Sequence, residues 1–292
     1  MDKRMIYTVA DHRFAVVAGE ALLGQMAQYE PFAVEPDAAP VLFTLTVAQE
    51  QPFPDVDIMV ETSQDDEGSQ ILVGHTADGK SYFEFLLCGD RSGCLLVSAD
   101  YSKATLWLYK HQLYGLNNAL MVLYALATAC LGTALFHSAV VSHEGRGYMF
   151  LGKSGTGKST HASLWCRYIE GTELVNDDNP VVRVFPHRAV VYGSPWSGKT
   201  PCYRNMSLPI GGIVQLSQAP YNKIRRLRSI EAYAALVPSI SGKRWERRVA
   251  DGLHETEDTL AGHVPVWYLE CLPDEAAARL CQETIKVVRA KK

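Results

Sequence analysis

The strongest constraint on the fold is a glycine-rich segment, residues 152–159, which reads Gly-Lys-Ser-Gly-Thr-Gly-Lys-Ser and fits the pattern G-x-x-x-x-G-K-[ST]. Its glycines let the backbone turn with successive N–H groups pointing inward, which forms a cradle for phosphate oxygens. The apolar run 148–151 predicts a strand before the loop, and helical spacing over 160–170 predicts a helix after it. We therefore expect an α/β domain built around a phosphate-binding loop.

The ligand expected at this loop is a nucleoside triphosphate, ATP or another, together with Mg²⁺. The helix adds its unpaired N-terminal donors and the positive end of its dipole. The Lys158 ammonium is expected to bridge the terminal phosphates, and the Ser159 hydroxyl to ligate Mg²⁺. The predicted nucleotide-binding residues are Gly152, Ser154, Gly155, Thr156, Gly157, Lys158, Ser159 and Thr160.

An acidic pair, Asp177-Asp178, follows the predicted strand 173–176. Phosphoryl transfer needs a metal to neutralise the phosphates and a group that orients or deprotonates the acceptor. Adjacent side chains on an extended chain point opposite ways, so a turn must begin here if both are to reach one site. Asn179-Pro180 provides that turn signal. One carboxylate is expected to hold Mg²⁺ and the other to act as general base; a plain surface turn is the alternative.

A histidine, His137, precedes the loop in the apolar run 136–141, where spacing alone favours an ordinary core residue. The order and spacing of His137, the glycine-rich loop and Asp177-Asp178 resemble HPr kinase/phosphorylase. They also resemble the nucleotide-binding part of ATP-dependent phosphoenolpyruvate carboxykinase, which shares that fold. The resemblance covers residues 136–198. It implies that the aspartates divide metal binding and base duty, which we assign to Asp177 and Asp178 respectively. It also implies that His137 lies beside the reacting groups as a catalytic residue.

The resemblance also implies a fold class and a function. The fold is an α/β, P-loop nucleotide-binding core of the HPr kinase/phosphoenolpyruvate carboxykinase type, with a strand-rich N-terminal region. The function is that of an Mg-ATP-dependent kinase acting on a hydroxyl acceptor, a Ser or Thr of a peptide or protein. Thr160 stands where HPr kinases have Glu, and their Arg- and Pro-rich C-terminal signature is missing, which argues against HPr itself as substrate. The alternatives are a non-catalytic nucleotide-binding regulator or scaffold, and a small-molecule kinase or carboxykinase-like enzyme.

A second segment, residues 193–200, also fits G-x-x-x-x-G-K-T. We do not interpret it as another nucleotide site, because Pro195 offers no N–H donor and Pro201 prevents a helix from following at once. We interpret it as an active-site loop whose Lys199 reaches a phosphate or the acceptor. A rigid turn with a solvated lysine is the alternative.

Composition narrows the partners and the location. A net charge of −4 gives no electrostatic reason to expect nucleic acid. The basic clusters at 223–228 and 243–248 are either solvated faces or a grip for an acidic acceptor. Seven cysteines with no C-x-x-C pair favour reduced thiols and a cytoplasmic location. The uncharged stretch 113–141 is long enough to test as a membrane span, but a buried helix and strand explain it better. The chain could act as a monomer or as a homo-oligomer, and the sequence favours neither.

The chain is expected to divide near Lys110. Residues 1–110 form a strand-rich region for packing or partner recognition, with a hairpin turn at Asp78-Gly79, a short helix at 22–29 and an exposed loop at 64–70. Residues 111–292 form the nucleotide-binding catalytic domain. Its helices are predicted at 117–131, 160–170, 230–236, 244–253 and 275–288, and its strands at 136–141, 148–151, 173–176, 181–185, 189–192, 210–216 and 264–271.

Overall fold

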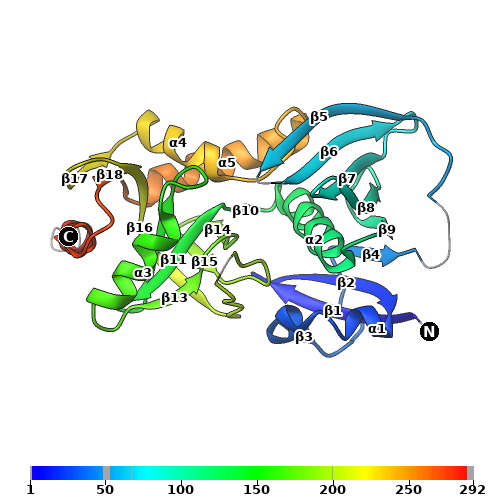
Figure 1. Ribbon diagram of the computed structural model, residues 1–292, viewed down its shortest axis with the longest axis horizontal. Helices are drawn as coiled ribbons and strands as arrows, with labels where there is room; N and C mark the ends of the chain where they lie inside the picture. Colours follow the sequence, from blue (N-terminus) through cyan, green and yellow to red (C-terminus); the bar gives the residue numbers. More distant parts are fainter. Residues whose placement is uncertain (1, 49–52, 67, 199, 288–292) are drawn as a thin grey trace. The chain divides into compact units, whose positions relative to one another are not determined.

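A computed structural model describes residues 2–48, 53–66, 68–198 and 200–287 of the chain (Figure 1). It divides into two compact units, Met1–Thr128 and Ala129–Lys292. Both are built on large sheets with helices, so the fold is mixed α/β. The sequence places the boundary before helix α2 (Gln112–Thr128), whereas the units divide after it.

The first unit is one nine-stranded sheet in the order β3-β1-β2-β4-β9-β8-β7-β6-β5. The pairs β2–β4 and β4–β9 are parallel, and the other neighbours are antiparallel. The strands are β1 (Asp2–Val9), β2 (His12–Gly19), β3 (Ala33–Val34), β4 (Phe43–Val47), β5 (Ile58–Asp66), β6 (Ser69–Thr76), β7 (Ser81–Leu87), β8 (Asp90–Val97) and β9 (Lys103–Leu108).

Helix α2 belongs to this unit because it packs on strands β7, β8 and β9. Its side chains Leu116, Leu120 and Tyr124 are fully buried, and the Tyr124 hydroxyl donates to the Val9 carbonyl at 3.0 Å. The helix backbone approaches β8 closely: a Cβ on Gly115 would lie 2.5 Å from the Ser92 carbonyl oxygen. Helix α2, which carries no Asp, Glu, Lys or Arg, is therefore part of the core of this unit. None of the helices in the described part of the chain is long and apolar enough to cross a membrane.

Two local predictions for this unit need correction. The polar stretch 64–70 is largely strand, because residues 64–66 end β5 and residues 69–70 begin β6, where backbone pairing between the strands outweighs side-chain polarity; residue 67 lies outside the described residues. The helix predicted at 22–29 is divided into α1 (Glu20–Leu23) and a 3-10 helix (Ala27–Phe32), and the chain leaves α1 at Gly24. The Asp78-Gly79 turn between β6 and β7 is confirmed.

The second unit is also built on a nine-stranded sheet, with the path β10-β14-β15-β16-β12-β11-β13; β18 pairs with β16, and β17 pairs with β18. The pairs β12–β16 and β16–β18 are parallel. The strands are β10 (Thr133–Leu135), β11 (Ser138–His143), β12 (Arg146–Leu151), β13 (Glu173–Asn176), β14 (Val181–Phe185), β15 (Arg188–Tyr192), β16 (Ser207–Gln218), β17 (Lys223–Leu227) and β18 (Val266–Cys271).

Helices α3 (Lys158–Tyr168) and α6 (Glu275–Val287) pack against each other beside this sheet (Figure 1). They share one core with alternate residues of β11, β12, β16 and β18, in which Trp165 of α3 contacts Phe150 at a ring distance of 5.4 Å. Helices α4 (Ile230–Leu236) and α5 (Arg247–His263) contact each other, and α5 also packs on β10, β14 and β15.

Two features of this unit differ from the sequence prediction. The basic stretch at 223–228 contains strand β17, which charge patterning does not indicate. The strand predicted at 136–141 begins later, at Ser138 of β11, and an additional strand, β10 at 133–135, precedes it. Between them, Phe136 forms an isolated bridge with Ile240, and His137 lies in the break. The break decides where the His137 side chain can reach.

Candidate functional site

The glycine-rich loop joins the buried strand β12 to helix α3. Gly152, Gly155 and Gly157 have φ angles of 155°, 75° and 105°, a region that side-chain-bearing residues rarely adopt. Gly157 is the N-cap residue of α3. A Cβ on Gly152 would lie 3.0 Å from the Thr156 side chain. The loop conformation therefore requires the glycines that define the pattern, and the strand–loop–helix context is the one expected from the sequence.

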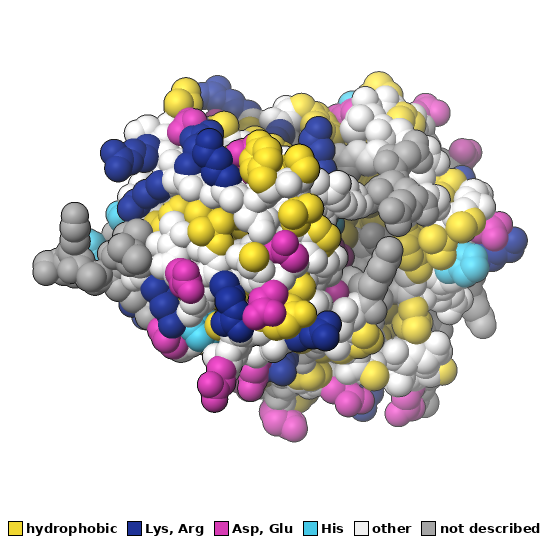
Figure 2. Space-filling view, turned by 60° about the vertical axis from the view of Figure 1, so that its left-hand side comes forward, with side chains coloured by type: hydrophobic (Ala, Val, Ile, Leu, Met, Phe, Trp, Pro, Cys, Tyr) yellow, Lys and Arg dark blue, Asp and Glu magenta, His cyan; other side chains and the backbone are white. Residues whose placement is uncertain are grey.

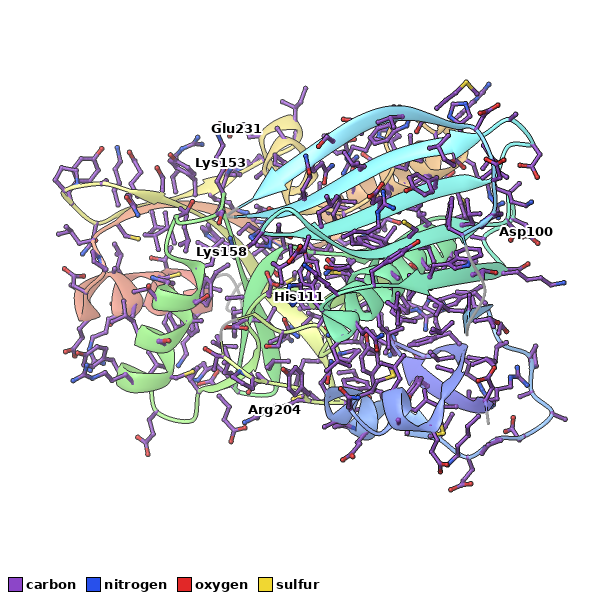
Figure 3. The ribbon with its side chains drawn as sticks, turned by 45° about the vertical axis from the view of Figure 1, so that its right-hand side comes forward. Asp100, His111, Lys153, Lys158, Arg204 and Glu231 are labelled. Atoms are coloured by element: carbon purple, nitrogen blue, oxygen red, sulfur yellow. The ribbon has the colours of Figure 1, made fainter. Side chains whose placement is uncertain are left out.

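Lys158, at the start of α3, is the buried cation of the loop. Its side chain is folded back, since Nζ donates to the carbonyl oxygens of Gly152 at 3.0 Å and Lys153 at 3.3 Å. The same nitrogen lies 2.8 Å from His137 Nε2. The residue is only 8% exposed, whereas Lys153 of the same loop is exposed. Figure 3 labels both lysines.

His137 links that lysine to Asp178. Its Nδ1 lies 3.0 Å from Asp178 Oδ1. An ammonium group has only donors, so Nε2 accepts from Lys158, and Nδ1 carries the proton and donates to the carboxylate. Backbone bonds hold both residues: the His137 N–H donates to the Ser239 carbonyl at 2.6 Å, and the Ser138 N–H donates to the Asp178 carbonyl at 2.8 Å. The side chains are 41% and 29% exposed, so this Lys158–His137–Asp178 row opens to solvent.

The neighbouring acid, Asp177, is used differently. Its Oδ1 accepts from Ser197 Oγ at 2.9 Å and from the Gly198 N–H at 2.8 Å, and its Oδ2 accepts from the Thr200 N–H at 3.1 Å. The carboxylate is buried and holds the second glycine-containing segment in place. A Cβ on Gly198 would lie 3.1 Å from Asp178 Cβ, so this close approach needs glycine. Lys199, predicted to act in the site, lies outside the described residues.

Asn176 is a site residue that sequence reasoning misses. Its side chain is fully buried, and Nδ2 donates to Ser194 Oγ and to the Trp196 carbonyl, both at 3.1 Å. Its Oδ1 accepts from the Asp178 N–H at 2.9 Å. The residue therefore ties the acidic pair to the 193–200 segment. An asparagine that ends an apolar strand directly before two aspartates is the signal that was available.

The remaining predicted nucleotide-binding residues lie together on the loop and the first turn of α3. Ser154, Gly155, Ser159 and Thr160 are exposed, and Thr156 and Gly157 are half-buried. The Gln218 side chain donates to the Gly155 carbonyl at 3.1 Å and so connects the end of β16 to the loop. Among the described residues, no group of three or more His, Cys, Asp or Glu side chains is placed to hold a metal ion.

The basic clusters are partly committed to structure. Arg244 pairs with the fully buried carboxylate of Glu257 at 2.5 Å and donates to the Val237 carbonyl at 3.1 Å. Arg225 of β17 pairs with Glu231 at 2.9 Å. Figure 2 shows basic and acidic side chains close together on the visible face.

Comparison with known proteins identifies no family. No protein-family model matches the chain, and neither does any curated protein. Among solved structures, the chain is similar to the HPr(Ser) kinase/phosphatase from Coxiella burnetii, with a TM-score of 0.32 and 12% sequence identity over 54% of this chain and 97% of that one. A likeness at this level does not define a family for the chain.

Proposed function

We propose that the second unit binds a nucleoside triphosphate with Mg²⁺ at residues 152–159 and transfers its terminal phosphoryl group to a hydroxyl acceptor. The observation that carries the proposal is the row Lys158–His137–Asp178. It places a buried cation, an imidazole and a carboxylate in direct contact at one end of a glycine-rich loop. An amine that only filled space in the fold would not need a histidine–aspartate pair beside it.

Binding would begin at the loop. Its glycines allow inward N–H groups, and the start of α3 adds unpaired donors, which together favour an anion. Lys158 now rests on two carbonyl oxygens of its own loop. Terminal phosphate oxygens would be stronger acceptors than these neutral carbonyls, because charge-assisted hydrogen bonds are about twice as strong as neutral ones. Lys158 would therefore turn toward the phosphates and leave His137 Nε2 free.

Mg²⁺ would be held by hard oxygen ligands, and the site has a matching donor. Ser159 is exposed on the first turn of α3, next to Lys158. Mg²⁺ needs one or two protein oxygens besides phosphate and water, so the absence of a larger acidic cluster among the described residues is compatible with it. Asp177 fits a ligand role less well than the sequence suggests, because three loop donors already use its carboxylate. When bound, the ion would neutralise charge on the phosphates.

The base would be His137, oriented by Asp178. With Lys158 turned away, His137 Nε2 can accept the proton of the acceptor hydroxyl as its oxygen attacks the terminal phosphorus. The bond from that phosphorus to the bridging oxygen breaks, and the nucleoside diphosphate leaves with the electron pair. Asp178 keeps the Nδ1–H tautomer in place and stabilises the imidazolium, the role of the carboxylate in other histidine–aspartate pairs. This refines the expectation that Asp178 alone is the base.

The acceptor we propose is a Ser or Thr hydroxyl of a peptide or protein, as the sequence resemblance implies. A transfer assay tests this with [γ-³²P]ATP, Mg²⁺, the full chain and a Ser/Thr peptide library, alongside calorimetric ATP binding. Asp178→Asn and His137→Ala should each slow labelling by about 10²–10⁴-fold, the usual contribution of a general base, while ATP affinity stays within about threefold. Asp251→Asn, an exposed aspartate of α5, is the matched control and should transfer normally.

The other outcomes are separable. Failure of the wild-type chain to bind Mg-ATP would overturn the proposal as a whole. Binding without any labelled product, also after cell extract is supplied as acceptor, would favour the nucleotide-binding regulator. Normal transfer by Asp178→Asn would show that the His137–Asp178 pair is not the base.

A further inference from the structure

A cleft of about 610 Å³ lies beside the glycine-rich loop, and the mechanism above does not use it. We infer that this cleft is a nucleobase site that accepts purines without reading their edges, so that the phosphoryl donor is a purine nucleoside triphosphate, ATP and GTP alike, and not an inorganic polyphosphate. The inference rests on the proposed function. The lining residues are Gly155, Thr156, Gly157, Thr160, His161, Leu164, Leu216, Gln218, Ala219, Cys271, Leu272 and Pro273.

The position of the cleft fits one end of a bound triphosphate. It shares the loop backbone at Gly155 and Gly157 and the first turn of α3 at Thr160. Lys158, His137 and Asp178 do not line it. A triphosphate that lies on the loop with its terminal phosphate at Lys158 therefore has its other end directed to the cleft. The size is appropriate, since ligand pockets commonly measure about 300–1,000 Å³.

The walls suit an aromatic base. Side chains from three elements, α3, the end of β16 and the end of β18, supply apolar surface, namely Leu164, Leu216, Ala219, Leu272 and Pro273. His161 adds the face of a buried imidazole ring, whose Nε2 accepts from Trp165 Nε1 at 3.2 Å. Gln218 is occupied with the Gly155 carbonyl. Apolar contact with the faces of a purine ring is what this surface offers.

The residues that line the cleft also predict how strongly it distinguishes ATP from GTP. None of the described residues that line the cleft is Asp, Glu, Lys or Arg. Guanine differs from adenine in its hydrogen-bonding edge, including an added N2 amino group. Sites discriminate strongly when they present polar groups that a wrong ligand leaves unpaired, and apolar pockets discriminate weakly. We therefore expect ATP and GTP affinities within about tenfold of each other, and tripolyphosphate to bind at least about tenfold more weakly than either.

Calorimetry with the magnesium complexes of ATP, GTP and tripolyphosphate tests the inference on the full chain. Ala219→Trp fills the cleft with a neutral side chain and should bring ATP affinity down to that of tripolyphosphate. Leu272→Asn removes an apolar contact at a position 39% exposed and should weaken ATP by about threefold to tenfold. Neither substitution should change tripolyphosphate affinity. Leu131→Asn, at a position 45% exposed outside the cleft, is the matched control and should leave all three affinities unchanged.

Cys271 provides a readout that needs no variant. This half-buried thiol lines the cleft, and exposed Cys88 in the first unit serves as an internal reference. Mass spectrometry after N-ethylmaleimide treatment should show that saturating Mg-ATP slows alkylation of Cys271 about fivefold or more, that tripolyphosphate does not, and that Cys88 is unaffected by both. Burial raises the pKa of the Cys271 thiol, so the reaction needs long incubation.

Failure of this inference and failure of the proposed function are distinguishable. If tripolyphosphate binds as well as ATP in the wild-type chain, or if Ala219→Trp retains the advantage of ATP, the cleft is not the base site although the phosphate loop stands. A preference of more than about 10²-fold between ATP and GTP would overturn the base tolerance. If none of the three ligands binds, the proposed function itself is wrong.

Discussion

His137 stands between Lys158 and Asp178 with each ring nitrogen engaged: Nε2 lies 2.8 Å from the lysine Nζ, and Nδ1 lies 3.0 Å from the aspartate Oδ1. The two contacts determine one neutral tautomer, since the lysine can only donate and the carboxylate can only accept. In the proposed reaction they would also couple binding to chemistry. A ligand that attracted the Lys158 ammonium would expose the basic nitrogen of His137 in the same movement.

Lys158→Ala should lower Mg-ATP affinity by about 10²-fold or more, because a charge-assisted contact to the terminal phosphates would be lost in a partly buried site. Lys153→Ala removes an exposed lysine of the same loop and should change affinity by less than about threefold. Calorimetric titration of both variants checks the difference. Equal losses would show that the loop lysines act only through net charge.

Asn176→Ala should destabilise the second unit by about 1–3 kcal/mol, the usual cost of an unmet buried polar group. The substitution leaves the Asp178 N–H without this acceptor, whereas the Trp196 carbonyl keeps the Ser194 hydroxyl as a donor. Denaturant unfolding measures the change, and Glu255→Ala at an exposed position of α5 should stay within about 0.5 kcal/mol of wild type. A wild-type unfolding curve for Asn176→Ala would remove Asn176 from the framework of the site.

Tyr7 should make the first unit sensitive to alkali. Its ring is buried against Tyr29 at 5.4 Å and Phe14 at 5.7 Å, and burial raises its pKa from 10.0 to about 12. Because the folded pKa is the higher one, this stabilisation is complete below pH 10 and is lost as pH rises toward 12. The loss should reach about 3 kcal/mol, because one pKa unit corresponds to about 1.4 kcal/mol.

Tyr7→Phe should flatten that part of the stability profile. Denaturant unfolding of the two chains between about pH 9 and pH 12, a range that includes both pKa values, makes the comparison. Leu131→Asn in the second unit changes no titratable group, serves as the control and should retain the wild-type slope. An identical alkaline slope for Tyr7→Phe would show that other groups control the loss.

Much of the local structure could be predicted because it depends on neighbouring residues. Glycines at 152, 155 and 157 permit backbone angles that other residues resist, so the loop and its place between a strand and a helix follow from the pattern. The turn at Asp78-Gly79 is confirmed for the same reason. Helix α3 begins two residues before the prediction, at Lys158, since the N-cap is itself one of the pattern glycines.

Other features depend on contacts between distant segments, which no local pattern contains. Composition predicts a domain boundary before α2, because the helix differs in composition from the strands that precede it. Packing against β7, β8 and β9 nevertheless joins α2 to the first unit. Strand β17 was missed because its charged residues lack apolar alternation, and pairing with β18 supplies its structure instead. Asp177 and Asp178 could be named but not distinguished, because the 197–200 donors that engage Asp177 come from a later segment.

The sequence alone determined the inventory of the site: a glycine-rich loop with its lysine and serine, two aspartates after a strand and a histidine upstream. Only the tertiary structure decided how these parts are connected. A break between β10 and β11 places His137 at the loop, and pairing of β11 with β12 and β13 brings Lys158 and Asp178 to the two sides of its ring. The physical reason is the distance along the chain over which each feature is determined. Backbone angles are set within a few residues, whereas a side-chain row across three strands exists only after sheet register and core packing have brought those strands together.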